Sequence, residues 1–442
     1  MERDLLKKLI LEQAQIPLPS DIVPRQIESV ITPLLKGDSI LIITGVRRCG
    51  KSILLKKLRK QRKDSDYYIN FDDDRLVNFT LADFQTLYEV FIELFGNQKS
   101  FYFDEIQIIE GWERFVRRLY EEGNKIFITG SNASMLSKEL GTRLTGRHIS
   151  ITMYPFSFYE FVAFKDKTLL EEAQKNNFIF TTQMTGQILR CFADYIQIGG
   201  IPEYVRNQQA EYIHSLFENI IYKDIIVRYK LTKEQEIKQL AFFIASNIGK
   251  NITYNAVRKM LGLGNASTIA EYYEYFANSF LAFLVNKYDA SLRKQIQNEK
   301  KQYMIDHGMA RLIGFRASDD IGRILENIIY VELLRRRHKI YSHDNNGECD
   351  FVLHESNRII AAIQVCKTLD DPQTKEREYK GLINAMRIYN LNDGLILTEN
   401  QQKTDIIVDS GNSYTIQIMP IWQWLLNTPN TPVNKLYCAN SP

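Results

Sequence analysis

One eight-residue segment constrains the fold of this 442-residue chain more than any other. Residues 45–52 read GVRRCGKS and fit GxxxxGK[ST], the pattern of a glycine-rich loop that cradles phosphate groups. An apolar, β-rich run, SILIIT, comes directly before the loop. A basic amphipathic run, SILLKKLRKQRK, begins at Ser52, the last residue of the loop segment. A strand, a tight turn and a helix in this order predict the first unit of a parallel α/β sheet.

The chemistry of phosphate binding explains the residue types in this loop. Glycines let backbone N–H groups curl around phosphate oxygens, and the N-terminus of the next helix adds partial positive charge. Lys51 would supply a point charge to the β and γ phosphates, and the Ser52 hydroxyl would ligate Mg²⁺. A plain glycine turn between strand and helix is the alternative. The predicted nucleotide contacts are Gly45, Val46, Arg47, Arg48, Cys49, Gly50, Lys51, Ser52 and Ile53.

A pair of carboxylates, Asp104 and Glu105, ends the apolar run SFYF. Open α/β sheets bind ligands at the carboxyl ends of their strands, so this pair should meet the phosphate loop. We expect Asp104 to hold Mg²⁺ through water, and Glu105 to orient or deprotonate the attacking water. Without the loop, the same pair would read as a solvated turn.

Four further polar residues are candidates for sensing or stabilising the transferred phosphate. The run KIFIT ends in GSN, so Ser131 or Asn132 would sit beside Glu105 and sense the γ-phosphate, with a loop cap as the alternative. Arg143 and Arg147 lie in GTRLTGRH. Either is a candidate arginine finger, supplied by this chain or by a neighbour, or else a surface residue at a helix end.

The motifs together resemble the AAA-type ATPases of bacteria and archaea that carry a C-terminal domain of unknown function. The resemblance rests on GVRRCGKS, YINFDDDR, FYFDEIQ with a later Trp, ITGSNASML, and LTGR followed by YPFSFYEF, and it continues in GGIPEYV and KKQYMIDHGMARLI. It implies ATP and Mg²⁺ as ligands, ATP hydrolysis, a winged-helix middle and a nuclease-like C-terminal fold. The downstream motifs identify the family and assign no activity.

Strand and helix patterns alternate through the first third of the chain and predict a P-loop NTPase parallel sheet. A helical and winged-helix middle and a PD-(D/E)XK-like α/β domain are expected to follow. The expected boundaries are 1–155 for the ATPase core with its helical lead-in, 156–230 for a helical lid or linker, 231–315 for the winged-helix-like domain, 316–425 for the restriction-endonuclease-like domain and 426–442 for a loose tail.

The middle contains a predicted helix-turn-helix: TYNAVRKML, the turn GLGNAS, and a longer helix. Thr268 with Glu271 forms a capping-box pattern, which favours Thr268 over Ser267 as the N-cap. Glu271 and Glu274 argue against this helix entering a DNA groove, which leaves a protein–protein or structural role favoured. A basic wing that contacts a nucleic-acid backbone is the alternative, with the residues Lys287, Arg293, Lys294, Lys300 and Lys301.

The C-terminal pattern resembles the PD-(D/E)XK nucleases, in which a helix carboxylate, an Asp and an E-x-K surround Mg²⁺. Glu326, Asp350 and Gln364 occupy these places as a second candidate metal site. Gln364 replaces the family's Glu, and Lys367 follows it by three residues instead of two. Because strand side chains alternate, Lys367 should point to the other face unless a bulge intervenes. The alternatives are an active nuclease and a degenerate fold used for binding or structure.

Composition limits the partners. Lys and Arg total 56 against 53 for Asp and Glu, so no broad basic field favours nucleic acid. Five scattered cysteines without a CxxC pair, and no apolar run long enough for a bilayer, predict a cytoplasmic protein with no membrane partner. We therefore expect an ATPase that changes conformation on hydrolysis. The alternatives are a nucleotide-gated protein-interaction switch with little turnover and an ATP-dependent DNA-binding protein or nuclease. The sequence leaves oligomerisation open.

Overall fold

The computed structural model describes residues 1–442 except 63–65, 134–145, 316–319, 410 and 427–442. The predicted tail therefore lies almost wholly outside the described residues. The chain forms two compact units: the first comprises Met1–Pro155 with Asn278–Phe280, and the second Phe156–Ala277 with Leu281–Pro442. No helix within the described ranges is both long and apolar enough to cross a membrane.

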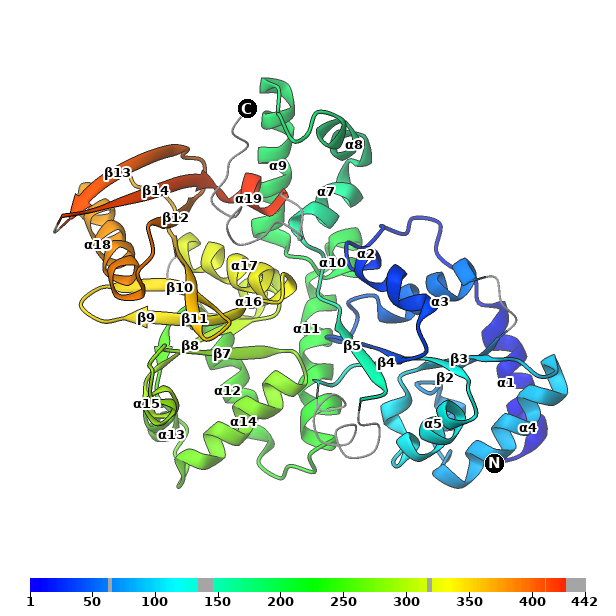
Figure 1. Ribbon diagram of the computed structural model, residues 1–442. Helices are drawn as coiled ribbons and strands as arrows, with labels where there is room; N and C mark the ends of the chain where they lie inside the picture. The colour runs from blue at the N-terminus through cyan, green and yellow to red at the C-terminus, as the bar shows by residue number, and fades with distance from the viewer. Residues whose placement is uncertain (63–65, 134–145, 316–319, 410, 427–442) are drawn as a thin grey trace. The chain divides into compact units, whose positions relative to one another are not determined.

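The first unit is built on a five-stranded sheet in the order β2-β3-β4-β1-β5 (Figure 1). Every strand pair in it is parallel, which confirms the predicted α/β core. The strands are β1 (Ile40–Thr44), β2 (Tyr67–Asn70), β3 (Ser100–Asp104), β4 (Lys125–Gly130) and β5 (His148–Thr152). All residues of β1 and β3 are buried, which explains their nearly continuous apolar sequence.

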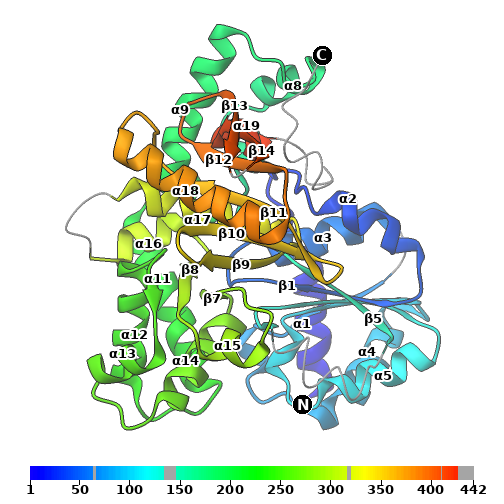
Figure 2. The same ribbon diagram turned by 60° about the vertical axis from the view of Figure 1, so that its left-hand side comes forward.

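Helices cover both faces of this sheet (Figures 1 and 2). One face packs on α1, α4 and α5 through a large apolar core, and α3 packs on the other face. The described residues of this unit contain the helices α1 (Arg3–Gln15), α2 (Glu28–Ile31), α3 (Lys51–Arg62), α4 (Phe84–Phe95) and α5 (Trp112–Glu121). Short helical turns are η1 (Thr32–Lys36), η2 (Asp74–Leu76), η3 (Leu81–Asp83) and η4 (Ile106–Ile108). This arrangement places the start of α3 at the carboxyl edge of the sheet.

The second unit begins with helices. They are α7 (Phe158–Lys165), α8 (Lys167–Lys175), α9 (Thr182–Ile198), α10 (Pro202–Asn207), α11 (Ala210–Asn219), the π-helix η6 (Ile220–Val227) and α12 (Glu234–Ser246). Further along the chain come α13 (Tyr254–Met260), α14 (Ala266–Asn278), α15 (Leu292–Gln297), α16 (His307–Ile313), α17 (Ile321–Arg335), α18 (Pro372–Tyr389) and α19 (Ile421–Leu426).

A three-stranded antiparallel sheet, ordered β6-β8-β7, accompanies the helix pair α13 and α14. Its strands are β6 (Asn251–Ile252), β7 (Ala282–Asn286) and β8 (Lys300–Met304). The predicted N-cap at Thr268 is wrong, because α14 already begins at Ala266 and the Asn265 side chain accepts from the Ser267 N–H over 3.0 Å. Asn265, three residues before Thr268, competes for the same unpaired N–H groups at the start of the helix.

A six-stranded mixed sheet, ordered β13-β14-β12-β11-β10-β9, forms the C-terminal part. Its strands are β9 (Lys339–Asp344), β10 (Glu348–Glu355), β11 (Arg358–Val365), β12 (Asp393–Thr398), β13 (Lys403–Asp409) and β14 (Asn412–Pro420). The central pairs β11–β12 and β12–β14 are parallel, and the outer pairs are antiparallel. Helix α18 packs on β10, β11 and β12 and closes an apolar core on that face.

Two downstream sequence motifs, GGIPEYV and DHGMA, dock against each other in the second unit. The Asp306 carboxylate accepts from the Gly200 N–H over 2.7 Å and caps α16 by accepting from the Met309 N–H over 2.8 Å. A Cβ added at Gly308 would lie 2.0 Å from the Ile198 carbonyl oxygen. These motifs therefore have a packing role, in which the glycines permit close backbone contact.

Candidate functional site

The phosphate loop follows β1 and is shaped by two glycines in backbone conformations that favour glycine. Gly45 has φ +147° and Gly50 has φ +104°. A Cβ at Gly45 would lie 2.1 Å from the carbonyl oxygen of Met153, the residue that follows β5. The loop therefore packs directly on the segment after β5, and only glycine fits at position 45.

Lys51 begins α3, and its side chain is folded into the loop and nearly fully buried. Its Nζ donates to the carbonyls of Gly45 and Val46, each over 3.1 Å, and lies 3.5 Å from Oε1 of Glu105. The predicted lysine and the predicted catalytic carboxylate are thus brought together, as a site for a polyphosphate requires.

Asp104 ends β3 and is fully buried. Its Oδ1 accepts from the Ser52 hydroxyl over 3.1 Å and from the Thr129 hydroxyl, and its Oδ2 accepts from the Tyr68 hydroxyl over 3.4 Å. Burial, and then the charge of Glu105, raise the pKa of Asp104. A cation placed beside this carboxylate would offset both effects.

Glu105 has a left-handed backbone conformation with φ 52°, which is uncommon outside glycine. Its N–H donates to the Thr129 hydroxyl over 3.0 Å, so Thr129 contacts both acidic residues. Burial opposes ionisation of Glu105, but the charge of Lys51 and a hydrogen bond from Gln107 outweigh it and lower its pKa. The side chain is therefore held as a carboxylate, the form that can accept a proton from water.

Ser131 and Asn132 follow β4 and are both buried. Gln107 connects the first of them to the acidic pair, because its Nε2 donates to Glu105 and lies 3.4 Å from the Ser131 hydroxyl. The structure therefore brings Ser131 into the same network as Glu105.

Of the two arginine candidates, the structure describes only Arg147, and it places this residue away from the rest of the site. Arg147 precedes β5 at the amino edge of the sheet, where its carbonyl accepts from the Ile40 N–H over 2.9 Å, and its guanidinium pairs with Glu121 at 2.8 Å. It is therefore at the opposite edge from the phosphate loop of its own unit. Arg143 lies outside the described residues. Within the loop itself, Arg47 lies 3.7 Å from Asp72.

The donors around Ser52 and Asp104 suit Mg²⁺. They are oxygen atoms, one of them a buried carboxylate, and Mg²⁺ in nucleotide sites is held by one or two such ligands plus phosphate and water. Among the described residues, no group of three or more His, Cys, Asp or Glu is arranged to hold a metal ion by itself. The first unit therefore fits a cation that arrives with a nucleotide.

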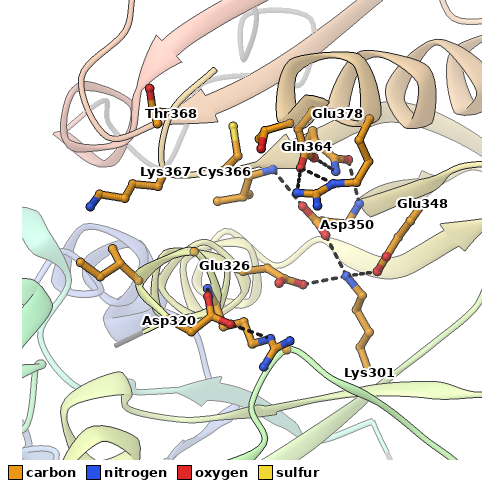
Figure 3. A pocket seen from close by; sticks show the side chains of 17 residues that line it. Lys301, Asp320, Glu326, Glu348, Asp350, Gln364, Cys366, Lys367, Thr368 and Glu378 are labelled. Carbon is orange, nitrogen blue, oxygen red and sulfur yellow. Dashed lines mark hydrogen bonds and ion pairs between the residues drawn. The ribbon is translucent and has the colours of Figure 1, made fainter. Parts of the chain in front are cut away.

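The second candidate site lies in a 610 Å³ pocket of the second unit, at the N-termini of α17 and α18. Glu326 and Asp350 converge there as predicted, but they converge on the ammonium of Lys301 (Figure 3). The Lys301 Nζ lies 2.9 Å from Glu326, 2.7 Å from Asp350 and 2.7 Å from Glu348. A lysine from β8 therefore supplies the positive charge that a metal ion would supply in a nuclease.

Electrostatics in this cluster follow from its burial. Burial alone would lower the pKa of Lys301, but Asp350 and Glu326 raise it well above its usual value. Burial raises the pKa of Glu326 to about 7 against the pull of Lys301. The Tyr303 hydroxyl adds a hydrogen bond to Glu326 over 2.5 Å. The cluster is an internal ion pair with one carboxyl group that titrates near neutral pH.

Gln364 and Lys367 lie on β11 and just after it. Gln364 accepts from the Asp350 N–H over 3.2 Å and donates to Glu378, so its amide serves neighbouring protein groups. Lys367 lies two residues beyond β11 and lines the same pocket as Glu326 and Asp350, but Figure 3 shows its side chain pointing away from both carboxylates.

The predicted basic wing is only partly available to a partner. Lys300 and Lys301 are both buried, and Lys300 donates to the carbonyls of Ile296 and Asn298. Only Lys287, Arg293 and Lys294 of that set remain accessible at the surface of the described chain. The basic surface offered to a nucleic acid is therefore smaller than the sequence implies.

Several residues of these sites escaped prediction. Thr129 and Gln107 are single polar residues in or after apolar runs, and Lys301 lies far from the carboxylates in sequence. Only the position of Thr129 at the end of a strand beside the acidic pair could have given a signal.

Comparisons with known proteins identify an AAA domain in the first unit and relatives that match most of the chain. The model of an AAA domain family matches residues 37–162, and that of a domain of unknown function, DUF8612, matches residues 189–319. The uncharacterized protein MJ1544 of Methanocaldococcus jannaschii is 32% identical over 439 residues, covering 96% of this chain and 95% of the relative. An uncharacterized protein of Haemophilus influenzae is 30% identical over 342 residues, covering 73% and 81% of the two chains.

A solved structure is also similar, though remotely. It is a Signal Transduction ATPase with Numerous Domains with a tetratricopeptide repeat sensor, from Pyrococcus horikoshii. The identity is 13%, the TM-score is 0.26, and the match covers 72% of this chain but only 46% of that one, so this chain spans about half its length.

Proposed function

The chain belongs to the same family as the M. jannaschii and H. influenzae proteins and carries an AAA domain, and from this premise we propose that it is a Mg²⁺-dependent ATPase. Nucleotide binding and turnover would drive a conformational change in a multidomain protein. A winged-helix-like middle and a nuclease-like C-terminal fold belong to the same proposal.

The carrying observation is that Lys51, Ser52, Asp104 and Glu105 meet at one edge of the sheet. Backbone N–H groups of Gly45–Ser52 and the Lys51 ammonium would bind the β and γ phosphates. In binding them, Lys51 would exchange its present carbonyl partners for phosphate oxygens.

Three other side chains would serve the attacking water. Glu105, held ionised, would accept its proton, Gln107 would keep the Glu105 carboxylate oriented, and Ser131 would contact the same water or the γ-phosphate. Ser52 and Asp104 would hold Mg²⁺, which supplies charge neutralisation of the phosphates when bound. Arg147 would act only on a nucleotide of a neighbouring copy, given its position at the far edge of its own sheet.

A single substitution tests this proposal. We expect Lys51→Ala to abolish ATP binding and turnover, measured by nucleotide titration and phosphate release. Lys60→Ala is the matched control, since Lys60 is exposed on the same helix. A Lys51→Ala protein that keeps both nucleotide affinity and turnover would overturn the proposal.

The alternatives are separated by two further measurements. If the protein is a nucleotide-gated switch for a protein partner, it would bind ATP but hydrolyse it very slowly. A DNA-acting protein would show DNA binding that weakens steeply with salt, or Mg²⁺-dependent cleavage that is lost in Asp350→Ala. The ion pair with Lys301 weighs against cleavage, because the cluster already holds a cation.

A further inference from the structure

Arg25 lies in the segment between α1 and α2, and its guanidinium contacts the backbone of the phosphate loop. The residue is 8% exposed. One guanidinium nitrogen donates to the Cys49 carbonyl over 2.8 Å, and the other donates to the Tyr154 carbonyl over 2.6 Å and lies 3.5 Å from that of Pro155. A permanently charged guanidinium thus hydrogen-bonds backbone carbonyls of two segments that are far apart in sequence.

The first contact fixes the orientation of a peptide in the loop. In a trans peptide the C=O and the following N–H point in opposite directions. Because the Cys49 carbonyl faces Arg25, the Gly50 N–H faces away from the guanidinium.

The second contact holds the segment that leads out of the first unit. Met153 continues the pairing of β5, with its N–H donating to the Thr44 carbonyl over 2.7 Å. The Cys49 thiol lies 3.4 Å from the Met153 carbonyl, and the loop meets that same carbonyl at Gly45. The phosphate loop therefore contacts both Arg25 and Met153, and Arg25 also holds residues 154 and 155.

The backbone of Arg25 is itself anchored. Its N–H donates to the Glu28 carboxylate over 2.7 Å, and that carboxylate pairs with Lys57 of α3 at 2.7 Å. The arginine is thus fixed relative to the helix that begins in the loop, which gives its guanidinium a defined position.

We propose that Arg25 is a positioning residue for nucleotide binding. It presents the Gly50 N–H to the phosphates, and it couples the state of the loop to residues 153–155, through which the chain leaves the ATPase unit. This inference rests on the proposed ATP binding and names a residue outside the sequence motifs as part of it.

The test compares Arg25→Met with Arg62→Met, a control that loses another arginine–carbonyl bond, to Leu35 over 2.7 Å, away from the loop. Affinities for a non-hydrolysable ATP analogue and for ADP are measured with KM and kcat. Loss of one charge-assisted hydrogen bond predicts affinities about tenfold weaker for both nucleotides in Arg25→Met. KM should rise while kcat changes little, because the Gly50 contact would act equally before and during reaction. If Arg25 served folding alone, Arg25→Met would lower the melting temperature without raising KM selectively over kcat.

Hydrogen–deuterium exchange tests the coupling. Binding of the analogue should slow exchange in a peptide covering residues 151–158 of the wild type and of Arg62→Met, and leave it unchanged in Arg25→Met. Unchanged affinity and an unchanged exchange response in Arg25→Met would overturn the inference. Should Arg25→Met not fold, Arg25→Lys decides: it keeps the charge but cannot span both carbonyls, so wild-type behaviour in it would equally overturn the inference. A wild type that binds no nucleotide would instead refute the proposed function.

Discussion

The hydroxyl of Ser52 donates a hydrogen bond to Oδ1 of Asp104 over 3.1 Å. The two residues come from the start of α3 and the end of β3, and their contact joins the phosphate loop to the acidic pair. A hydroxyl and a carboxylate held together at a phosphate-binding edge are the donors expected of a Mg²⁺ site.

Replacing Asp104 by Asn tests this role. The amide keeps the size of the side chain and removes its charge, so the Mg²⁺ concentration for half-maximal ATPase activity should rise about 10- to 100-fold. Magnesium titrations of phosphate release measure the effect. Asp73→Asn is the control, since Asp73 follows β2 and pairs with Arg75. Equal Mg²⁺ requirements in the two variants would contradict the assignment.

Glu105→Gln separates turnover from binding. Loss of the proton acceptor should lower kcat by about 10²–10⁴-fold, with ATP affinity kept or improved, so that ATP becomes trapped. Single-turnover kinetics and filter retention of labelled ATP measure both. Glu110→Gln, at an exposed position a few residues on, should behave as wild type. Unchanged turnover in Glu105→Gln would favour the switch-like alternative.

The sequence was sufficient for the ATPase core because its signals are local. A glycine-rich loop between a strand and a helix specifies its own geometry, and apolar strands buried on both faces predict a parallel sheet. Asp104 and Glu105 then follow from the rule that strand ends share an edge.

The remaining features depend on contacts that no local pattern encodes. Arg25 acts through backbone carbonyls, which leave no trace in sequence. Lys301 meets Asp350 across different sheets, and a lysine in a basic-looking run reads as a solvated residue when its fold is unknown. At the start of α14, two candidate acceptors, Asn265 and Thr268, lie within four residues, and the sequence does not show which of them bonds the N–H groups of the helix.

Lys301→Met should destabilise the second unit. Removing Lys301 leaves the Asp350 carboxylate buried with an uncompensated charge, which costs about 3–5 kcal/mol in comparable cases. Urea unfolding followed by circular dichroism measures the loss. Lys259→Met, at an exposed position on α13, should change stability by less than about 0.5 kcal/mol. Adding Asp350→Asn to Lys301→Met should recover part of the loss, and failure to recover any would contradict a charge-based cause.

The same cluster predicts a pH dependence. Because burial raises the pKa of Glu326 to about 7, above its ordinary value, the folded state holds this proton more tightly than the unfolded state. Its contribution to stability is therefore fully present below about pH 4.5 and is lost as pH rises through about 7. Melting temperatures of the wild type relative to Glu326→Gln should fall between pH 5 and pH 8. A difference that is flat or rises over this interval would refute the assignment.

Gly308→Ala tests the docking of the two family motifs. Alanine is favoured over glycine within a helix by about 1 kcal/mol, but here its Cβ would meet the Ile198 carbonyl. We expect the overlap to prevail and the second unit to lose about 1–3 kcal/mol. Gly264→Ala is the control, because nothing lies within 4 Å of a Cβ at that position. Stabilisation by Gly308→Ala would show that the backbones separate without penalty.

The ammonium at the centre of the acidic pocket is tethered to the chain, and this has a consequence for how the protein responds to its surroundings. A bound ion exchanges with solution and is removed by chelators, whereas Lys301 stays at the same carboxylates whatever the supply of divalent cations. Removal of Mg²⁺ by a chelator should therefore abolish ATPase activity and leave the melting temperature of the second unit unchanged. The two units would then differ in their dependence on Mg²⁺. The first unit would need this cation from solution, whereas the second carries its own cation in the Lys301 side chain.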